Sequence, residues 1–329
     1  MKLTNLLTII TILLILLAII GHIVRDITVE FGLLMYIPLL PLGLWAILWD
    51  LSQMGRSLPR FRFSLTIVGL GMAVWGSISM LGMESSQVDL ANKISILHWN
   101  VRWGGTNGWQ SISQDIIQQN PDIAIISETP AKTKLNQLLK QLGKQWSMLT
   151  YNNNKRNPLA VYSPWPLRLE DYVKIKNVSA MTVIVTLHNQ PLRILVIDAE
   201  RNMSTKFAVM SIEMLPRWRT PMLADMTKII ANYQTAGKPI DIIAGDFNAL
   251  SISLGFKDFD QVAGGYNLAA KFSNGWRGTW KSYLPLYDLD HVWVHKRFTG
   301  LRTNMFTNLK TDHRGQIVKF NNIQLDKAF

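Results

Sequence analysis

Long apolar runs fill the first quarter of the chain, and no run of that length occurs after it. The three runs cover about residues 5–24, 31–51 and 63–83. An α-helix needs about 20 consecutive apolar residues to cross a bilayer. The pattern therefore predicts three transmembrane helices within a membrane anchor formed by residues 1–83.

The first run also stands where a secretory signal peptide would stand. Its apolar stretch is longer than that of a usual signal peptide, and no small-x-small cleavage pattern follows it. We therefore expect it to remain as a membrane span. A buried helical hairpin is the alternative for the second and third runs, but long helices that are apolar on every side favour lipid. Pro38 and Pro41 in the second run are compatible with a membrane helix.

Basic residues between the apolar runs predict the orientation in the membrane. The loop of residues 52–62 carries Arg56, Arg60 and Arg62 and no acidic residue. Cytoplasmic loops are enriched in Lys and Arg, so this loop is expected inside the cell. Three spans then place the C-terminal part of the chain outside. We expect a multi-pass protein of the cell membrane with an extracytoplasmic catalytic domain and the lipid bilayer as a partner, and the sequence indicates no protein partner.

A different pattern begins after the polar linker of residues 84–92, and residues 93–329 form one predicted domain. Short β-rich runs alternate there with amphipathic stretches. The predicted strands cover residues 94–101, 123–127, 160–162, 167–173, 181–187, 192–197, 240–244, 292–294, 301–305 and 317–320. The predicted helices cover residues 109–119, 132–142 and 222–234, and Pro216 and Pro221 interrupt a helical region before the last of them. Many strands with few helices are typical of an α/β sandwich.

Composition narrows the classes of protein to which the chain can belong. Of its 329 residues, 48% are hydrophobic and 17% are charged, which disfavours an intrinsically disordered protein. Cysteine is absent, so disulfides, thiolate zinc sites and a cysteine nucleophile are excluded. The net charge is +12, and most of it lies after residue 83. This charge suits an anionic partner such as nucleic acid or a phospholipid headgroup, although a solvated basic surface has the same composition.

Polar side chains follow or open several of the predicted strands. Ligands in α/β folds gather at the carboxyl ends of strands. Taken singly, each of these residues is a common turn or surface residue. Together they form an ordered set, which consists of Asn100, Glu128, Asp246, Asn248, Asp290, Asp312 and His313.

These residues occur in five short motifs: His98-Trp-Asn-Val, Ser127-Glu128, Gly245-Asp-Phe-Asn248, Leu289-Asp-His291 and Thr311-Asp-His313. In this order and spacing the chain resembles the endonuclease/exonuclease/phosphatase superfamily of metal-dependent phosphodiesterases, over about residues 93–320. Residues 279–291 are also similar to those of membrane-anchored bacterial members. The resemblance implies an α/β fold, a four-layer sandwich of two packed mixed β-sheets flanked by helices, here preceded by three transmembrane helices.

The chemistry of phosphodiester hydrolysis requires a hard cation, an activated water and stabilised charge on the phosphoryl oxygens. Mg²⁺ takes oxygen ligands, usually one or two carboxylates with several waters. Glu128 is therefore the first expected metal ligand, with Asn100 beside it. The resemblance implies that Asp312 is a second carboxylate of the metal site. Mg²⁺ is the expected cofactor, and Mn²⁺ is the alternative cation.

The resemblance also assigns catalytic roles. It implies that Asp246 orients or deprotonates the attacking water, and that Asn248 hydrogen-bonds the phosphate or that water. His313 is similar to the family's terminal histidine, which contacts the phosphate or acts as acid or base. An imidazole in that role needs an orienting carboxylate, and Asp290 matches this partner.

One expected family residue is missing from the sequence. The family usually has a histidine, or a Tyr/Asn pair, at the end of the strand before the long helical region, where this chain has none. Asp198, Glu200 and Asn202 are the candidates to replace it, and the sequence does not choose among them. Asn202 and Trp280 are the expected substrate-binding residues, although a tryptophan is equally suited to the core.

We expect a membrane-anchored phosphoric ester hydrolase that depends on a divalent metal, with nuclease-like cleavage of nucleic acid as the favoured activity. Hydrolysis of a phospholipid headgroup, as in a sphingomyelinase, is one alternative. A catalytically degenerate module that binds an anionic ligand is the other, and the missing histidine favours it.

Overall fold

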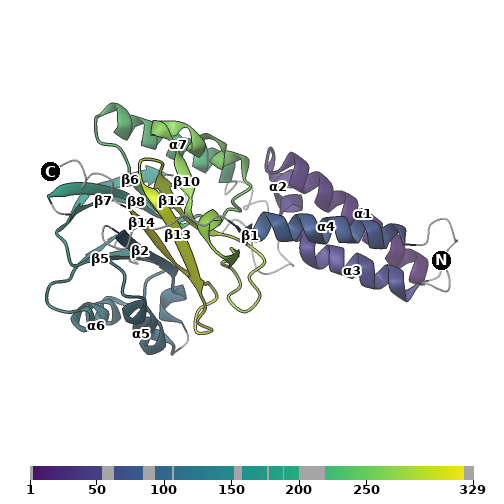
Figure 1. Ribbon diagram of the computed structural model, residues 1–329, viewed down its shortest axis with the longest axis horizontal. Coiled ribbons are helices and arrows are strands. Elements are labelled where there is room, and N and C mark those ends of the chain that lie inside the picture. Colours follow the sequence, from purple (N-terminus) through teal and green to yellow (C-terminus); the bar gives the residue numbers. More distant parts are fainter. Residues whose placement is uncertain are drawn as a thin grey trace. The chain divides into compact units, whose positions relative to one another are not determined.

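The computed structural model describes residues 3–53, 63–83, 93–105, 107–151, 158–175, 178–187, 189–199 and 219–321. The chain divides into two compact units (Figure 1). The N-terminal unit comprises residues 1–81 with residues 252–254, and the second unit comprises residues 82–251 and 255–329.

The N-terminal unit is helical. It contains α1 (Leu3–Val24), α2 (Val29–Met35), α3 (Leu39–Ser52) and α4 (Ser64–Met80). Among the described helices, α1 alone is long and apolar enough to cross a membrane by itself. α2 and α3 meet that test only together, and they are bent by 60° at the break between them. α4 has 17 residues, which is short for a span.

Three transmembrane helices were predicted, whereas the described residues contain one helix that could cross a membrane, or two spans if α2 and α3 count as one bent span. Proline explains the break in the second predicted run. Pro38 has φ −76° and ψ 120° and stands just before α3. A proline ring excludes the helical conformation for the residue before it, so α2 ends ahead of Ile37. The arginine-rich loop of residues 54–62 lies outside the described residues. The predicted orientation consequently stays a prediction.

Small residues bring α3 and α4 into close contact. A Cβ atom added to Gly43 would lie 2.5 Å from the backbone oxygen of Gly69, and one added to Gly69 would lie 2.6 Å from that of Gly43. The two backbones thus touch, and no other residue fits at either position. Contact through small residues is typical of helices that pack in lipid.

The second unit contains two six-stranded sheets. The first sheet consists of β2 (Lys93–Asn100), β3 (Ile123–Ser127), β4 (Ser147–Thr150), β5 (Leu159–Ser163), β13 (Thr299–Phe306) and β14 (Gly315–Asn321). The second consists of β6 (Leu167–Ile175), β7 (Val178–Leu187), β8 (Gln190–Ala199), β9 (Ile242–Asp246), β10 (Tyr266–Leu268) and β12 (Asp290–His295). The strand orders are β13-β14-β2-β3-β5-β4 and β10-β12-β9-β8-β7-β6. Both sheets are mixed, because β2 and β3 are parallel in one and β8 and β9 are parallel in the other.

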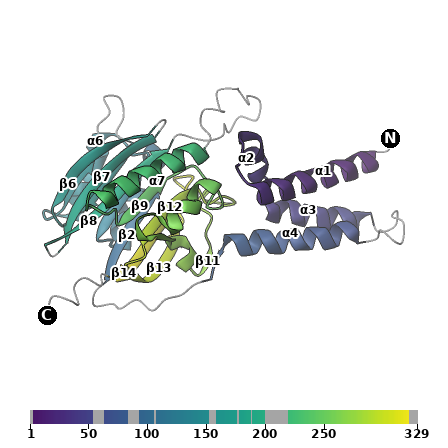
Figure 2. The ribbon, with the colours of Figure 1, turned by 90° about the horizontal axis from the view of Figure 1, so that it is seen from above.

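Helices cover the outer faces of both sheets. α5 (Trp109–Gln119) and α6 (Lys132–Leu142) pack on the first sheet through side chains such as Ile112 and Leu135 (Figure 1). α7 (Arg219–Thr235) packs on the second through residues such as Met226, and Figure 2 shows it along that face. A continuous apolar core fills the space between the two sheets. The predicted α/β fold of two packed mixed sheets with flanking helices is confirmed.

The elements differ from the prediction in a few places. Every strand and helix predicted after residue 92 is present, with ends that shift by a few residues. The sequence did not predict β4, β10 or the two-residue strands β1 (Leu81–Gly82) and β11 (Gly275–Trp276). Pro221 does not interrupt a helix, because it lies in the first turn of α7, where its missing N–H would have no partner in the helix. Pro216 lies outside the described residues.

Candidate active site

The two-residue period of the strands places polar side chains at one end of the core between the sheets. Side chains of β2 at residues 94 and 96 belong to that core, so Asn100 lies on the same face of the strand. In β9 the core residues Ile242 and Ala244 likewise put Asp246 on the inner face. Two strands of different sheets therefore direct polar side chains to the same end of the apolar core.

Three aspartates form one row across the second sheet. Asp198 at the end of β8 is in register with Asp246 at the end of β9, and Asp246 is in register with Asp290 at the start of β12. Residues in register on adjacent strands point to the same face of a sheet. The row therefore gathers three carboxyl groups at the end of the core where Asn100 lies.

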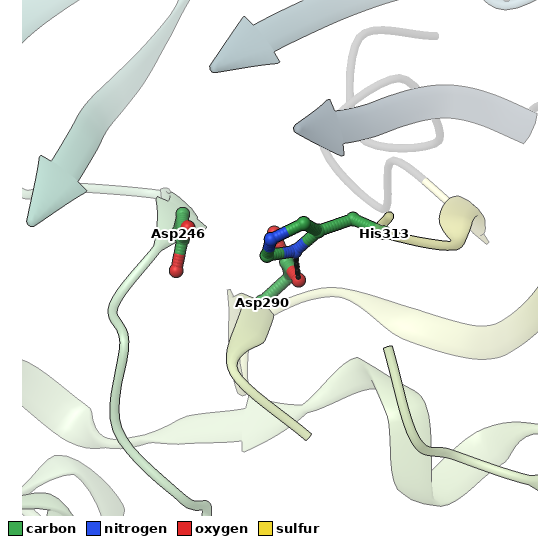
Figure 3. Close-up of side chains that lie close together, drawn as sticks. All are labelled: Asp246, Asp290 and His313. Carbon is green, nitrogen blue, oxygen red and sulfur yellow. Dashed lines mark hydrogen bonds and ion pairs between the residues drawn. The ribbon is translucent and has the colours of Figure 1, made fainter. Parts of the chain in front are cut away.

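Asp246, Asp290 and His313 form the centre of the site (Figure 3). All three are buried, and one potential ligand atom of each lies within 4.8 Å of those of the others. His313 Nδ1 lies 2.7 Å from Asp290 Oδ2, and this contact orients the imidazole ring. Thr279 Oγ1 accepts hydrogen bonds from the backbone N–H groups of Leu289 and Asp290 at 3.0 and 3.2 Å. The start of β12, and with it Asp290, is held in place by these bonds.

Two asparagines fix the carboxylate of Asp246. Asn100 Nδ2 donates a hydrogen bond to Asp246 Oδ2 at 2.8 Å, and the backbone N–H of Asn248 donates to Asp246 Oδ1 at 2.8 Å. The side chain of Asn248 donates to the carbonyl oxygen of Ala199 at 2.7 Å. Both oxygens of Asp246 thus have a donor, and the end of β8 is bound to the turn that follows β9.

Glu128 follows β3 directly and has a left-handed backbone conformation, with φ 46°. Its carbonyl oxygen accepts a hydrogen bond from Trp103 N at 2.6 Å, and its backbone N–H donates to the carboxylate of Asp198. A residue other than glycine keeps a positive φ only where the surrounding structure holds its backbone in that conformation. The turn that presents Glu128 is therefore held by residues of both sheets.

Asp312 and Trp280 lie beside this centre and contact each other. The indole N–H of Trp280 is 3.4 Å from Asp312 Oδ2, and Arg102 Nε and Lys281 Nζ lie 3.8 and 3.9 Å from the carboxylate of Asp312. The compact group of potential metal ligands found among the described residues does not include Asp312. Its charge is instead shared with two basic side chains.

Comparison with known proteins agrees with this arrangement. Residues 97–313 match the family model described as "Endonuclease/Exonuclease/phosphatase family". The chain belongs to the endonuclease/exonuclease/phosphatase family. A search of curated protein sequences finds no match.

Solved structures of this family share the fold of the second unit. The human Nocturnin catalytic domain with bound sulfate is 20% identical, with a TM-score of 0.53, over 71% of this chain and 95% of that one. Beta toxin from Staphylococcus aureus is 13% identical, with a TM-score of 0.52, over 68% and 99% of the two chains. TDP2 from D. rerio, in complex with a single-strand DNA product, is 14% identical, with a TM-score of 0.50, over 70% and 99%. At sequence identities this low, the structural similarity shows a shared fold.

Burial and charge set the protonation of the central residues. Burial and the Asp290 carboxylate together raise the pKa of Asp246 to about 7, although the charge of His313 opposes the rise. Burial alone would lower the pKa of His313, but the charge and hydrogen bond of Asp290 outweigh it and raise that pKa to about 10. Burial would also raise the pKa of Asp290, and the charge of His313 lowers it overall. At neutral pH the pair is an imidazolium and a carboxylate.

The family is expected to bind a divalent cation, and the residues present fit one. Burial and the charges of Asp246 and Glu128 raise the pKa of Asp198. The charges of Asp290 and Glu128 likewise raise the pKa of Asp246. Carboxylates that destabilise one another in a buried site are stabilised by a cation, and carboxylate and amide oxygens are the donors that Mg²⁺ prefers. Glu128 and Asn100 would hold it beside Asp246.

The structure thus brings together Asn100, Asp246, Asn248, Asp290 and His313 from four separate strands or turns. Glu128 acts on Asp246 through its charge, whereas Asp312 and Trp280 lie to one side. Asn202 and Glu200 lie outside the described residues, so Asp198 is the one candidate for the missing histidine that the described structure places at the site.

Sequence reasoning did not find Thr279, and it left His98 without a partner. His98 is fully buried, burial lowers its pKa to about 4, and its Nε2 lies 3.1 Å from Ser127 Oγ. It therefore joins β2 to β3 directly behind Asn100 and Glu128. In the sequence its position two residues before Asn100 places it on the same face of the strand.

Proposed function

We propose that the chain hydrolyses a phosphodiester with the help of a divalent cation, and that nuclease-like cleavage is its favoured activity. The observation that carries the proposal is the buried group of Asp246, Asp290 and His313 with Asn100 bound to Asp246. It combines a carboxylate whose pKa lies near neutrality with an imidazolium. A general base works best when its pKa is near the working pH.

Each central residue has a role in this proposal. Asp246 accepts a proton from the attacking water, and the hydrogen bonds from Asn100 and Asn248 hold its carboxylate in one orientation. His313, held by Asp290, donates from Nε2 to a phosphoryl oxygen and stabilises its charge. Asn248 contacts the phosphate or the water. A cation held by Glu128 and Asn100, Mg²⁺ or alternatively Mn²⁺, would neutralise charge on the phosphoryl oxygens.

Substrate contacts outside the centre are proposed for Trp280, with Asp312 as a further carboxylate near the cation. A substrate stacked on the indole would lie next to Lys281, whose Nζ is 4.8 Å from the centre of the Trp280 ring. The net charge of +12 suits a polyanion. TDP2 has been solved with a single-strand DNA product and Nocturnin with sulfate, which supports an anionic substrate. Nucleic acid is accordingly the first substrate class to test.

We also propose that the N-terminal unit anchors the chain in the cell membrane as a multi-pass protein, with the hydrolase unit outside. The length of α1 and the backbone contact between Gly43 and Gly69 support a location in lipid. The orientation rests on Arg56, Arg60 and Arg62, with Lys2 in agreement, and on the third apolar run crossing the membrane after that loop. A reporter that is active only in the cytoplasm, fused after Phe329, should be inactive, and an active reporter would contradict the orientation.

The test of the hydrolase proposal uses the full chain in detergent micelles with single-stranded DNA, duplex DNA, RNA and phospholipid vesicles. We expect turnover of one phosphodiester that depends on Mg²⁺ or Mn²⁺ and is lost on chelation. Glu128→Gln should remove it while leaving the far-ultraviolet circular dichroism unchanged. Asp171→Asn is the matched control, because Asp171 is an exposed acid of β6 remote from the site. No turnover with any divalent metal would favour the anion-binding module instead.

A further inference from the structure

Exposed apolar side chains are concentrated around the active-site segment of the second unit. Among the described residues 93–321, six large hydrophobic side chains are exposed. Ile117 and Tyr172 lie on α5 and β6, outside the catalytic motifs. The other four are Trp103, Tyr283, Leu284 and Leu309, with exposed fractions of 40%, 73%, 58% and 74%. We call these four the docking rim.

The backbone connects the segments of the docking rim to one another. Ser282, next to Tyr283, donates hydrogen bonds from its N–H to the carbonyl of Asp312 at 2.8 Å and from its hydroxyl to that of Thr311 at 2.7 Å. Leu309 lies two residues before Thr311. Trp103 follows Arg102, whose Nε is 3.8 Å from Asp312. The loops that carry Trp103 and Tyr283 thus both contact the segment that carries Leu309 and His313. Each of these three segments bears at least one exposed apolar side chain.

Basic side chains accompany the docking rim. Arg102 and Lys310 are adjacent in sequence to Trp103 and Leu309, and Lys281 is two residues before Tyr283. Arg102 and Lys281 retain side-chain exposures of 52% and 35% although both are near Asp312. Lys310 is exposed as well. The surface therefore combines aromatic rings, aliphatic side chains and positive charge.

This combination matches the chemistry of a bilayer surface. Aromatic rings favour the headgroup level, aliphatic side chains favour the acyl chains beneath it, and Lys and Arg are attracted to anionic headgroups. A single-stranded nucleic acid would use the rings and the charges. Binding of nucleic acid does not explain why Leu284 and Leu309 are exposed. These leucines cannot stack on bases and yet are among the most exposed apolar residues.

We propose that the docking rim binds the surface of a phospholipid bilayer that contains anionic lipid and holds the active site against it. The N-terminal α1 could cross a membrane, so the same chain would remain close to such a surface. This inference concerns binding, so it stands or fails separately from the proposed hydrolysis.

The absence of cysteine from the chain makes a direct test available. Leu284→Cys and Leu309→Cys would each carry an environment-sensitive fluorophore in the full chain, reconstituted into vesicles of phosphatidylcholine and phosphatidylserine. Tyr172→Cys, at an exposed aromatic of β6, is the matched control. All three positions are exposed, so the substitutions leave the core unchanged. Spin-labelled lipids that quench the fluorophore within the bilayer report its depth.

We expect a blue shift and quenching at positions 284 and 309 and neither at 172. Lys281→Gln together with Lys310→Gln should reduce the quenching by several-fold, and replacing phosphatidylserine by phosphatidylcholine should have the same effect. Absence of quenching at 284 and 309, or equal quenching at 172, would overturn the proposal. A shift caused by single-stranded DNA in micelles and not by vesicles would overturn it too, and would assign the rim to nucleic acid.

Discussion

The side chain of Asn100 donates a hydrogen bond of 2.8 Å to Asp246 across 146 positions of sequence. Asn100 ends β2 of one sheet and Asp246 ends β9 of the other, so this bond joins the two sheets at the site. Both side chains are buried, with at most 1% exposure. A charged acceptor in such a place depends strongly on its donors, because an unpaired buried charge is costly.

Asn100→Ala should therefore lower both the affinity for Mg²⁺ and the turnover. Loss of the amide removes one donor from Asp246 and the oxygen that we propose as a cation ligand. We expect Mg²⁺ affinity to fall about tenfold or more and turnover at saturating Mg²⁺ to fall as well, the scale of a hydrogen bond to a charged group. Isothermal titration calorimetry and steady-state kinetics measure the two effects. Unchanged Mg²⁺ affinity with lowered turnover would limit Asn100 to holding Asp246.

Asp246→Asn should remove activity and yet stabilise the protein without metal. Burial raises the pKa of this carboxyl to about 7, so the folded state keeps a proton that the unfolded chain releases near its ordinary value of 3.8. Stability then falls as the pH rises through that window, and above pH 7 the fold carries the full cost of the buried charge. The variant lacks this cost and should melt at higher temperature than the wild type at pH 8 in a chelator.

The same variant should lose at least about 10² in rate, the usual scale for a general base. The difference in melting temperature should shrink toward pH 4, where the wild-type carboxyl is protonated in the folded state and little of the cost of the buried charge is left. Thermal melts at pH 4 and pH 8, with and without Mg²⁺, check the prediction. A variant less stable than the wild type at pH 8 in chelator would show that Asp246 is already compensated by its neighbours.

Asp290→Asn tests the pairing with His313. The pKa of His313 is raised to about 10 by Asp290, so the pair stabilises the fold fully below the ordinary value of 6.5 and loses this contribution as the pH rises toward 10. Without the Asp290 charge, burial dominates and the pKa of His313 should fall. NMR titration of the imidazole should show the shift, and the pH–rate limb assigned to His313 should move to lower pH.

Non-additivity provides a second check of this pair. His313→Ala should cost at least about 10² in rate, and the double variant with Asp290→Asn should be little worse, because residues that act as a unit are not additive. Losses that multiply would mean that the two side chains act independently. An Asp290 that only caps the start of β12 would lower stability and leave the pH profile unchanged.

The pattern of apolar residues was sufficient to predict much of the hydrolase unit. Short β-rich apolar runs such as those of β2 and β9 predicted the strands, and the polar residue at the end of each predicted a site. The motif residues that meet at Asp246 were found because each directly follows or opens a strand. Register between strands is not visible in one sequence, so the row of Asp198, Asp246 and Asp290 could not be predicted.

The N-terminal unit was predicted less well. The apolar run from residue 31 to 51 was predicted to be one span, in which Pro38 and Pro41 were expected to produce no more than a kink. Pro38 divides it, because the ring prevents the preceding residue from being helical. The resemblance implied that Asp312 is a carboxylate of the metal site, and the structure shows its side chain near Arg102 and Lys281. Side-chain direction in a turn depends on tertiary contacts that a motif does not contain.

Asp198 is the residue whose role the structure changes most, and its substitution gives the last prediction. Its carboxylate accepts the backbone N–H of Glu128, which has φ 46°, and it lies in register with Asp246. Asp198→Asn keeps the size and removes the charge, so the Glu128 turn loses a charged acceptor and the site loses one carboxylate. We expect Mg²⁺ affinity to fall by about tenfold, the scale of a partner that orients a metal ligand.

The dependence of turnover on Mg²⁺ concentration in Asp198→Asn distinguishes an effect on the cation from direct contact with the substrate. If Asp198 acts through Glu128 and the cation, the loss of turnover should be largely restored by raising the Mg²⁺ concentration, since the affinity and not the chemistry is impaired. Asp198→Ala should be worse, because the amide of the Asn variant can still accept the Glu128 N–H through its oxygen. Asp171→Asn on β6 should leave the affinity unchanged. If turnover of Asp198→Asn stays low at saturating Mg²⁺, Asp198 contacts the substrate itself, in the place of the histidine that the family usually has.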